Sequence, residues 1–278
     1  MSLREQIATW RQRLLGKPAD KKPRVGLALS GGSIRGLAHL GVVMELLAAG
    51  VEPACVVGVS AGSIVGALVA ARVPPERLHE LGRTVTWARV SRWVLPGHMG
   101  LLSLKPLETM LEAEIGAKTF ADLPIPFACG AFDVEREEFL LLREGPVARA
   151  VRASCAVPGV FTPVEWNGRL LVDGGVFNNL PVRPLFDMGA DYVIAVDLFP
   201  PRRTPRRPSS TFSLLEVAFY SMIRANSHER ALAHVLIEPD IRDASFWDFA
   251  ERDALIEAGR KAAQEALPRI LADLGIST

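Results

Sequence analysis

The residues of this chain that are best suited to chemistry surround Ser60. Gly58, Ser60 and Gly62 fit the pattern GxSxG, with an apolar stretch before it and small residues after it. In this pattern a sharp turn from strand to helix exposes the serine hydroxyl, and the residues two places away must be small for the turn to close. The helix that follows presents its amino terminus, which favours developing negative charge. The pattern predicts Ser60 as a nucleophile.

A glycine-rich segment from Ser30 to Gly36 ends an earlier apolar stretch and begins a helical pattern. The backbone amides of such a loop can bind an anion or an oxyanion. The segment does not fit the dinucleotide-binding GxGxxG, because its glycines stand at 31, 32 and 36. It does not fit a phosphate-binding loop either, because Leu37 stands where the lysine belongs. We therefore expect an oxyanion hole.

A nucleophilic serine needs a base, and the residues alone leave two choices open. The chain order of an α/β-hydrolase permits a triad of Ser60, Asp173 and either His228 or His234, although neither histidine clearly follows a strand. Asp173 itself stands at the expected exit of a strand, and the two glycines after it allow close approach of the backbone. An aspartate in an ordinary glycine-rich turn has the same local sequence.

Four ordered segments resemble those of the patatin-like phospholipase family, and the resemblance covers roughly residues 24–240. They are the glycine-rich loop at 29–41, the GxSxG turn at 58–62, the block at 152–164, and the run from Asp173-Gly-Gly to Asn178-Asn-Leu-Pro. The chain departs from the family at Ser33, where a third glycine is usual. A residue with a side chain must then supply that amide.

The resemblance implies a serine acyl-ester hydrolase of the phospholipase A, lysophospholipase or esterase type. In the implied dyad Ser60 attacks the ester carbonyl, while Asp173 takes the proton and later helps to activate water, with an acyl-enzyme between the two steps. The expected oxyanion hole consists of the amides of Gly31, Gly32 and Ser33, with Arg35 nearby. No cofactor is implied, and no metal, because no His, Cys or carboxylate cluster has ligand spacing. A Ser-His-Asp esterase and a weakly active lipid-binding regulatory protein are the alternatives.

Alternating strand and helix patterns predict the scaffold that positions these residues. The stretches 25–29 and 55–59 are apolar throughout, as strands covered by helices on both faces must be, and helical patterns follow at 36–49 and 61–72. Together with the resemblance, this predicts a three-layer α/β/α fold with a central, mostly parallel sheet. The remaining expected elements are strands at 126–133, 137–142, 191–197 and 235–237, a hairpin at 164–172 that turns at Asn167-Gly168, and helices at 214–233 and 247–274.

We expect one such domain with two appendages. Residues 1–23 would form an amphipathic helix and a linker, 24–240 the hydrolase domain, and 241–278 a helical segment packed on that domain. The arginines of the first helix suit an anionic membrane surface, while its apolar stripe equally suits docking on the domain or on a partner. Residues 84–106 combine tryptophans and leucines with glycine and proline, which fits a lid, a wall of an acyl-chain groove, or ordinary core packing.

Charge and cysteine content limit the possible partners. The net charge of +1 gives no signature of nucleic-acid binding, so we expect no such partner. Residues 1–24 carry +5 and the four arginines between 202 and 207 carry +4, which leaves −8 for the rest. The three cysteines lie in apolar contexts without metal spacing, and the start of the chain does not resemble a secretory signal. We expect a cytoplasmic protein with a lipid or acyl-ester substrate, and peripheral contact with anionic membrane is a further hypothesis.

Overall fold

The computed structural model describes residues 22–95, 99–199, 207–241 and 244–276. A mixed sheet crosses these residues in the order β10-β9-β1-β2-β5-β8-β7, and β6 also pairs with β5. The parallel strands are β1 (Val25–Leu29), β2 (Cys55–Val59), β5 (Phe127–Asp133), β9 (Tyr192–Val196) and β10 (Val235–Ile237). The antiparallel strands are β6 (Glu138–Leu142), β7 (Val164–Trp166) and β8 (Arg169–Asp173).

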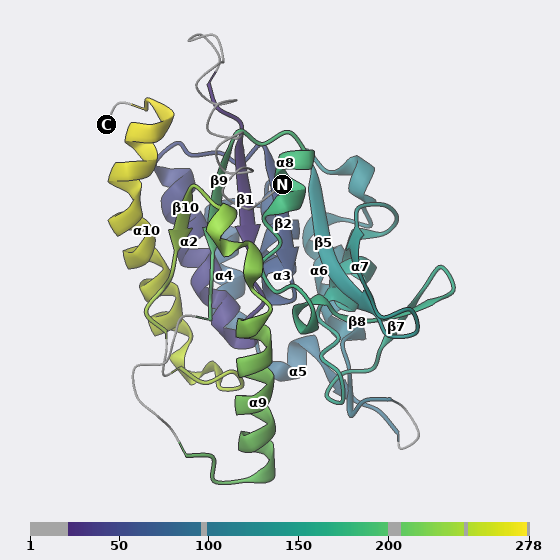
Figure 1. Ribbon diagram of the computed structural model, residues 1–278. Coiled ribbons are helices and arrows are strands. Elements are labelled where there is room, and N and C mark those ends of the chain that lie inside the picture. The colour runs from purple at the N-terminus through teal and green to yellow at the C-terminus, as the bar shows by residue number, and fades with distance from the viewer. Residues whose placement is uncertain (1–21, 96–98, 200–206, 242–243, 277–278) are drawn as a thin grey trace.

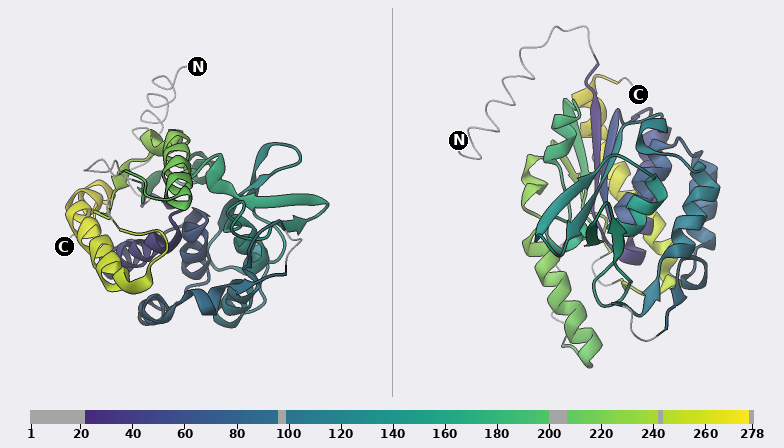
Figure 2. Two further views of the ribbon diagram at one scale, coloured as in Figure 1. Left: turned by 90° about the horizontal axis from the view of Figure 1, so that it is seen from below. Right: turned by 90° about the vertical axis from the view of Figure 1, so that its right-hand side faces the viewer.

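Helices cover both faces of this sheet (Figures 1 and 2). The helices are α2 (Leu37–Ala48), α3 (Ala61–Ala70), α4 (Pro75–Thr84), α5 (Trp87–Val90), α6 (Lys105–Ile115), α7 (Val147–Ser154), α8 (Arg183–Asp187), α9 (Thr211–Ala225) and α10 (Arg252–Leu274). Consecutive residues of a strand face opposite sides of the sheet and pack in different hydrophobic clusters. In β2, Val56 packs with the cluster beneath α2 and α3, whereas Val57 packs with Leu185 of α8. The predicted three-layer α/β/α fold with a mostly parallel sheet is therefore confirmed.

The predicted hairpin is present, and its turn has the expected backbone. β7 and β8 pair antiparallel with Trp166 opposite Arg169, so that Asn167 and Gly168 alone connect them. Their φ angles are 50° and 72°, the two positive values that a type I′ turn requires. β8 ends at Asp173, which confirms the expected position of this carboxylate at the exit of a strand.

Two predicted helices have different limits in the structure. The helix expected at 214–233 is α9, which ends at Ala225 and is followed by a separate 3-10 turn at 228–232. The reason lies far away in sequence, because Glu229 accepts hydrogen bonds from the amides of Val182 and Arg183 at the start of α8. The helix expected at 247–274 begins only at Arg252. The helix expected within residues 1–23 lies almost entirely outside the described residues.

The long helix α10 packs along α2, and two glycines permit the contact. A Cβ at Gly259 would collide with the carbonyl oxygen of Ala38, and a Cβ at Gly41 would collide with that of Ile256. The two helix backbones therefore touch directly, which fixes α10 on the same side of the sheet as α2 and α3 (Figure 1).

We predict that Gly259→Ala destabilises the protein by about 1–3 kcal/mol, because the added methyl group overpacks the contact. At an unconstrained helix position the same change would stabilise by up to about 1 kcal/mol. Urea unfolding measures the difference. Glu265→Ala, at an exposed position of the same helix, is the matched control and should change stability by less than about 0.5 kcal/mol. A Gly259→Ala protein as stable as wild type would contradict the packing argument.

Candidate active site

Ser60 occupies a strained turn between β2 and α3. Its φ of 51° and ψ of −125° are unusual for a residue with a side chain, and its position is only 8% exposed. A Cβ at Gly58 would collide with the carbonyl of Gly62, which agrees with the requirement for small residues in the pattern. The amide of Ser60 donates to Ser154 Oγ at 2.9 Å, and this hydroxyl donates to the Gly130 carbonyl at 2.6 Å. The Ser154 hydroxyl therefore links the turn to β5.

Asp173 lies at the same edge of the sheet, where β8 pairs with β5. Its carboxylate is 3% exposed and accepts a hydrogen bond from the Gly175 amide at 2.8 Å. Burial raises its pKa to about 6, and contacts with the Ser60 hydroxyl and the Gly175 amide limit the rise because they favour the charged form. Ser60 and Asp173 both line one cavity, although 113 positions separate them in the chain.

The backbone amides of the loop after β1 differ in their hydrogen bonding. The Gly31 amide is already bonded to Asn179, at 3.1 Å from Oδ1 and 3.3 Å from the carbonyl oxygen. The amides of Gly32 and Ser33 have no hydrogen-bond acceptor within the described ranges. Ser33 adopts a φ of 53°, the left-handed conformation that glycine adopts most easily. The Gly32 and Ser33 amides are therefore available to an acceptor in the cavity that these residues line, whereas the Gly31 amide is already bonded.

The Arg35 side chain, expected near the oxyanion hole, has its hydrogen bonds with another segment of the chain. The side chain is 1% exposed, and its Nε and Nη2 donate to the Ala244 carbonyl at 3.1 and 2.6 Å. The guanidinium also lies 3.9 Å from the ring centre of Phe246, in cation–π geometry. Arg35 thus binds the segment that leads into α10.

That segment, residues 244–249, was not expected in the site. Ser33 Oγ donates to the Phe246 carbonyl at 2.7 Å, and the Ile34 amide donates to the same oxygen at 3.4 Å. Phe246 and Trp247 then line the cavity. No local signal in the sequence marks this role, since the contact joins residues more than 200 positions apart.

None of the histidines that the structure describes lines the cavity of Ser60. Nδ1 of His234 accepts from the Val193 amide at 3.0 Å, and its ring stacks on Tyr192 at the edge of the sheet. Neither His228 nor any other histidine in the described ranges lines the cavity, and His98 lies outside them. His39 is buried beneath the glycine-rich loop with Nε2 2.8 Å from the Ser30 carbonyl. Burial lowers its pKa to about 4, so it is neutral and donates to that carbonyl.

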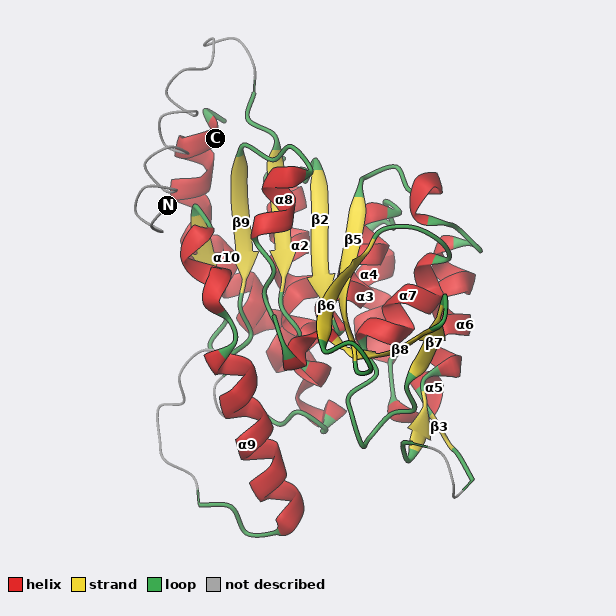
Figure 3. Ribbon diagram, turned by 45° about the vertical axis from the view of Figure 1, so that its right-hand side comes forward, coloured by secondary structure: helices red, strands yellow, loops and turns green. Residues whose placement is uncertain are grey.

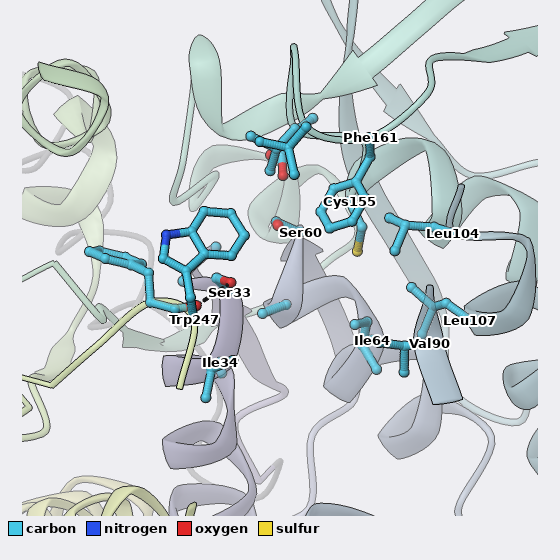
Figure 4. A pocket seen from close by; sticks show the side chains of 18 of the residues that line it. Ser33, Ile34, Ser60, Ile64, Val90, Leu104, Leu107, Cys155, Phe161 and Trp247 are labelled. Atoms are coloured by element: carbon cyan, nitrogen blue, oxygen red, sulfur yellow. Dashed lines mark hydrogen bonds between the residues drawn. The ribbon is translucent and has the colours of Figure 1, made fainter. Parts of the chain in front are cut away.

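The cavity beside Ser60 has a volume of about 700 Å³ and an almost entirely apolar lining. Figure 4 shows Ser33 and Trp247 on one side of Ser60, with Phe161, Leu104 and Leu107 on the other. From the stretch 84–106, whose role was left open, the side chains Trp87, Val90, Leu101 and Leu104 line the cavity. This favours the interpretation of that stretch as a groove wall.

No group of three or more His, Cys, Asp or Glu side chains within the described residues could hold a metal ion. The thiol of Cys155 also lines the cavity, 3.8 Å from Ser63 Oγ, and burial raises its pKa well above the usual range. It is therefore protonated at neutral pH and a poor nucleophile. Among the side chains on the cavity wall, the Ser60 hydroxyl has the Asp173 carboxylate beside it.

Comparison with known proteins finds relatives that are named as NTE family proteins or as lysophospholipase NTE1. An uncharacterized NTE family protein of Mycobacterium tuberculosis is 35% identical over 181 residues, which cover 64% of this chain and 50% of that protein. Lysophospholipase NTE1 of Debaryomyces hansenii is 29% identical over 281 residues, covering 88% of this chain and 18% of that protein. The chain spans about half the length of the curated mycobacterial relatives that it matches, and a smaller part of the yeast protein.

Solved structures share the fold. VipD from Legionella pneumophila superimposes with a TM-score of 0.62 at 13% identity, covering 90% of this chain and 67% of that one. The type III effector ExoU gives a TM-score of 0.53 at 17% identity, covering 89% and 53%. The family model of patatin-like phospholipase matches residues 27–186, more than half of this sequence. The chain therefore belongs to the patatin-like phospholipase family.

Proposed function

We propose that this protein hydrolyses acyl esters of lipids, as a phospholipase A, lysophospholipase or esterase, with Ser60 as nucleophile and Asp173 as base. The observation that carries the proposal is the shared position of the two side chains. A serine in a strained turn and a buried carboxylate line one apolar cavity, and no described histidine reaches it. The name of the yeast relative, a lysophospholipase, agrees with a lipid substrate.

The proposed reaction begins when Ser60 Oγ bonds to the ester carbonyl carbon while its proton passes to Asp173. The carbonyl oxygen becomes negative and accepts hydrogen bonds from the amides of Gly32 and Ser33. The bond to the leaving alcohol then breaks, and the alcohol oxygen takes the proton from Asp173. Water attacks the acyl-enzyme in the same way, which releases the fatty acid and restores Ser60.

Burial of the base supports this role. An ordinary aspartate, with a pKa of about 3.9, is a weak base for a hydroxyl. The desolvation that raises the pKa of Asp173 to about 6 makes it a better proton acceptor, while it remains ionised at neutral pH. The apolar cavity thus serves two purposes, since it holds an acyl chain and strengthens the base.

We predict that Ser60→Ala and Asp173→Asn each reduce turnover of a long-chain p-nitrophenyl ester by about 10³-fold or more. A fluorophosphonate probe should label wild type but not Ser60→Ala. His228→Ala and His234→Ala are the controls and should keep their activity. Loss of activity in either histidine variant would favour a triad, and absence of labelling in wild type would favour a lipid-binding protein without catalysis.

The stability of Asp173→Asn separates loss of chemistry from loss of fold. The pKa of Asp173 is about 6 in the folded state and about 3.9 in the unfolded state, so the folded state binds more protons between these values. Stability therefore falls as pH rises through this window, and the cost of the buried charge is fully present at pH 8. Asp173→Asn should melt at or above the wild-type temperature at pH 8.

The pH dependence of kcat/KM should report the ionisation of Asp173. Protonated Asp173 cannot accept the Ser60 proton, so we predict that kcat/KM falls about tenfold per unit below pH 6 and is level above it. An ester that does not ionise between pH 4.5 and 8.5 is a suitable substrate. A profile that stays level down to pH 4.5 would exclude Asp173 as the base.

Variants of Ser33 test the oxyanion loop. Ser33→Ala keeps the left-handed backbone and loses the bond to the Phe246 carbonyl, so it should destabilise by about 1–2 kcal/mol and lower kcat. Ser33→Gly loses the same bond but relieves the backbone strain, so it should be the more stable and more active of the two. Urea unfolding and ester turnover measure both effects. A Ser33→Gly protein that is less stable than Ser33→Ala would contradict the strain argument.

A further inference from the structure

Large apolar side chains are exposed mainly at one end of the molecule. Nine of them are strongly exposed in the described ranges, and seven belong to two elements. One is the hairpin of β3 (Arg92–Trp93) and β4 (Leu102–Ser103), and the other is α9. The seven, called the mouth residues below, are Trp93, Leu95, Met99 and Leu101 on the hairpin and Leu214, Leu215 and Met222 on α9. Exposed apolar patches of this kind mark interaction sites.

The mouth residues are continuous with the apolar cavity. Leu101, Leu215 and Met222 are exposed to solvent and also line the cavity that contains Ser60. Figure 3 shows β3 and α9 projecting from the end of the molecule toward which β2 and β9 point. An apolar surface therefore extends from two projecting elements into the cavity beside the nucleophile.

The charge of these two elements is positive. Residues 85–103 and 207–225 contain four arginines, Arg89, Arg92, Arg207 and Arg224, and a single acid, Glu216. The four arginines are exposed. These two stretches thus carry a net charge of +3, whereas the whole chain carries +1. Apolar side chains bordered by arginines are typical of surfaces that enter the headgroup region of anionic membranes.

We propose that the hairpin and α9 together form a membrane-binding surface, which inserts its apolar side chains into a bilayer containing anionic lipid. The ester then passes from the bilayer into the cavity without crossing water. Trp93, exposed by 78%, is suited to the interface between headgroups and acyl chains. No helix in the described ranges is long and apolar enough to span a membrane. The delivery of substrate rests on the proposed function, whereas membrane binding does not.

The test is a triple variant, Trp93→Ser, Leu95→Ser and Leu214→Ser, in the full chain. These side chains are 57–79% exposed and do not line the cavity, so the protein should fold and should hydrolyse a soluble short-chain ester within about twofold of wild type. Co-sedimentation with vesicles of phosphatidylcholine and 30% phosphatidylglycerol measures binding. We expect a loss of affinity of about tenfold or more, with a similar loss of vesicle hydrolysis. Val134→Ser, at an exposed apolar position outside both elements, is the matched control and should bind like wild type.

The charge is tested by Arg92→Glu combined with Arg224→Glu. This variant should lose the preference for anionic over neutral vesicles, because each cation near the surface adds a favourable contribution. A triple variant that binds vesicles as tightly as wild type would overturn the proposal. So would a wild-type dimer that dissociates in the triple variant, since a second copy would then cover the mouth residues.

Deletion of residues 1–22 is the remaining comparison. If it abolishes vesicle binding while the triple variant binds normally, the contact lies elsewhere and the proposal fails. A failure of the proposed catalytic function looks different. Wild type would then fail to hydrolyse the soluble ester, while co-sedimentation would still report whether the mouth residues bind the bilayer.

Discussion

The close approach of two backbones at the carboxyl edge of the sheet is the constraint on which the site depends. Gly62, in the first turn of α3, lies so near the carbonyls of Leu29 and Ser30 that any side chain would collide with them. A Cβ at Gly36 would likewise collide with the Cβ of Ala61, the residue after Ser60. The loop after β1 and the turn that carries Ser60 are therefore held together by main chain, which does not need to reorganise when charge develops in a reaction.

Burial raises the pKa of Asp173, the candidate base, and it also lowers the stability of the folded protein at neutral pH. The interior that surrounds Asp173 favours the neutral acid, and only the Gly175 amide and the Ser60 hydroxyl oppose this. A group whose charged form is disfavoured in the folded state destabilises the protein at neutral pH. Proteins commonly accept such a cost at functional sites, where strain and unfavourable burial accompany reactivity. The left-handed backbone of Ser33 and the strained backbone of Ser60 are further examples in the same place.

The segment between β10 and α10 explains the departure from the usual glycine at position 33. The Ser33 hydroxyl bonds to the Phe246 carbonyl, and the neighbouring Arg35 binds the Ala244 carbonyl and covers the Phe246 ring. These bonds join the loop with the free amides to a wall of the cavity. A glycine would relieve the backbone strain but could not make the first bond. Ser33 thus accepts a strained backbone in return for a hydrogen bond to the segment before α10.

The sequence by itself determined the features that depend on local backbone sterics and on short-range hydrophobic pattern. These are the GxSxG turn, the apolar strands of an α/β sheet and the type I′ turn at Asn167, and each can be predicted because its cause lies within a few residues. Only the tertiary structure decided which donors and side chains are available to the site. The Gly31 amide is bonded by Asn179, 148 positions away, and Arg35 is drawn to a carbonyl 209 positions away. Such contacts, and the desolvation that shifts a pKa, depend on segments that are brought together only by packing of the whole chain.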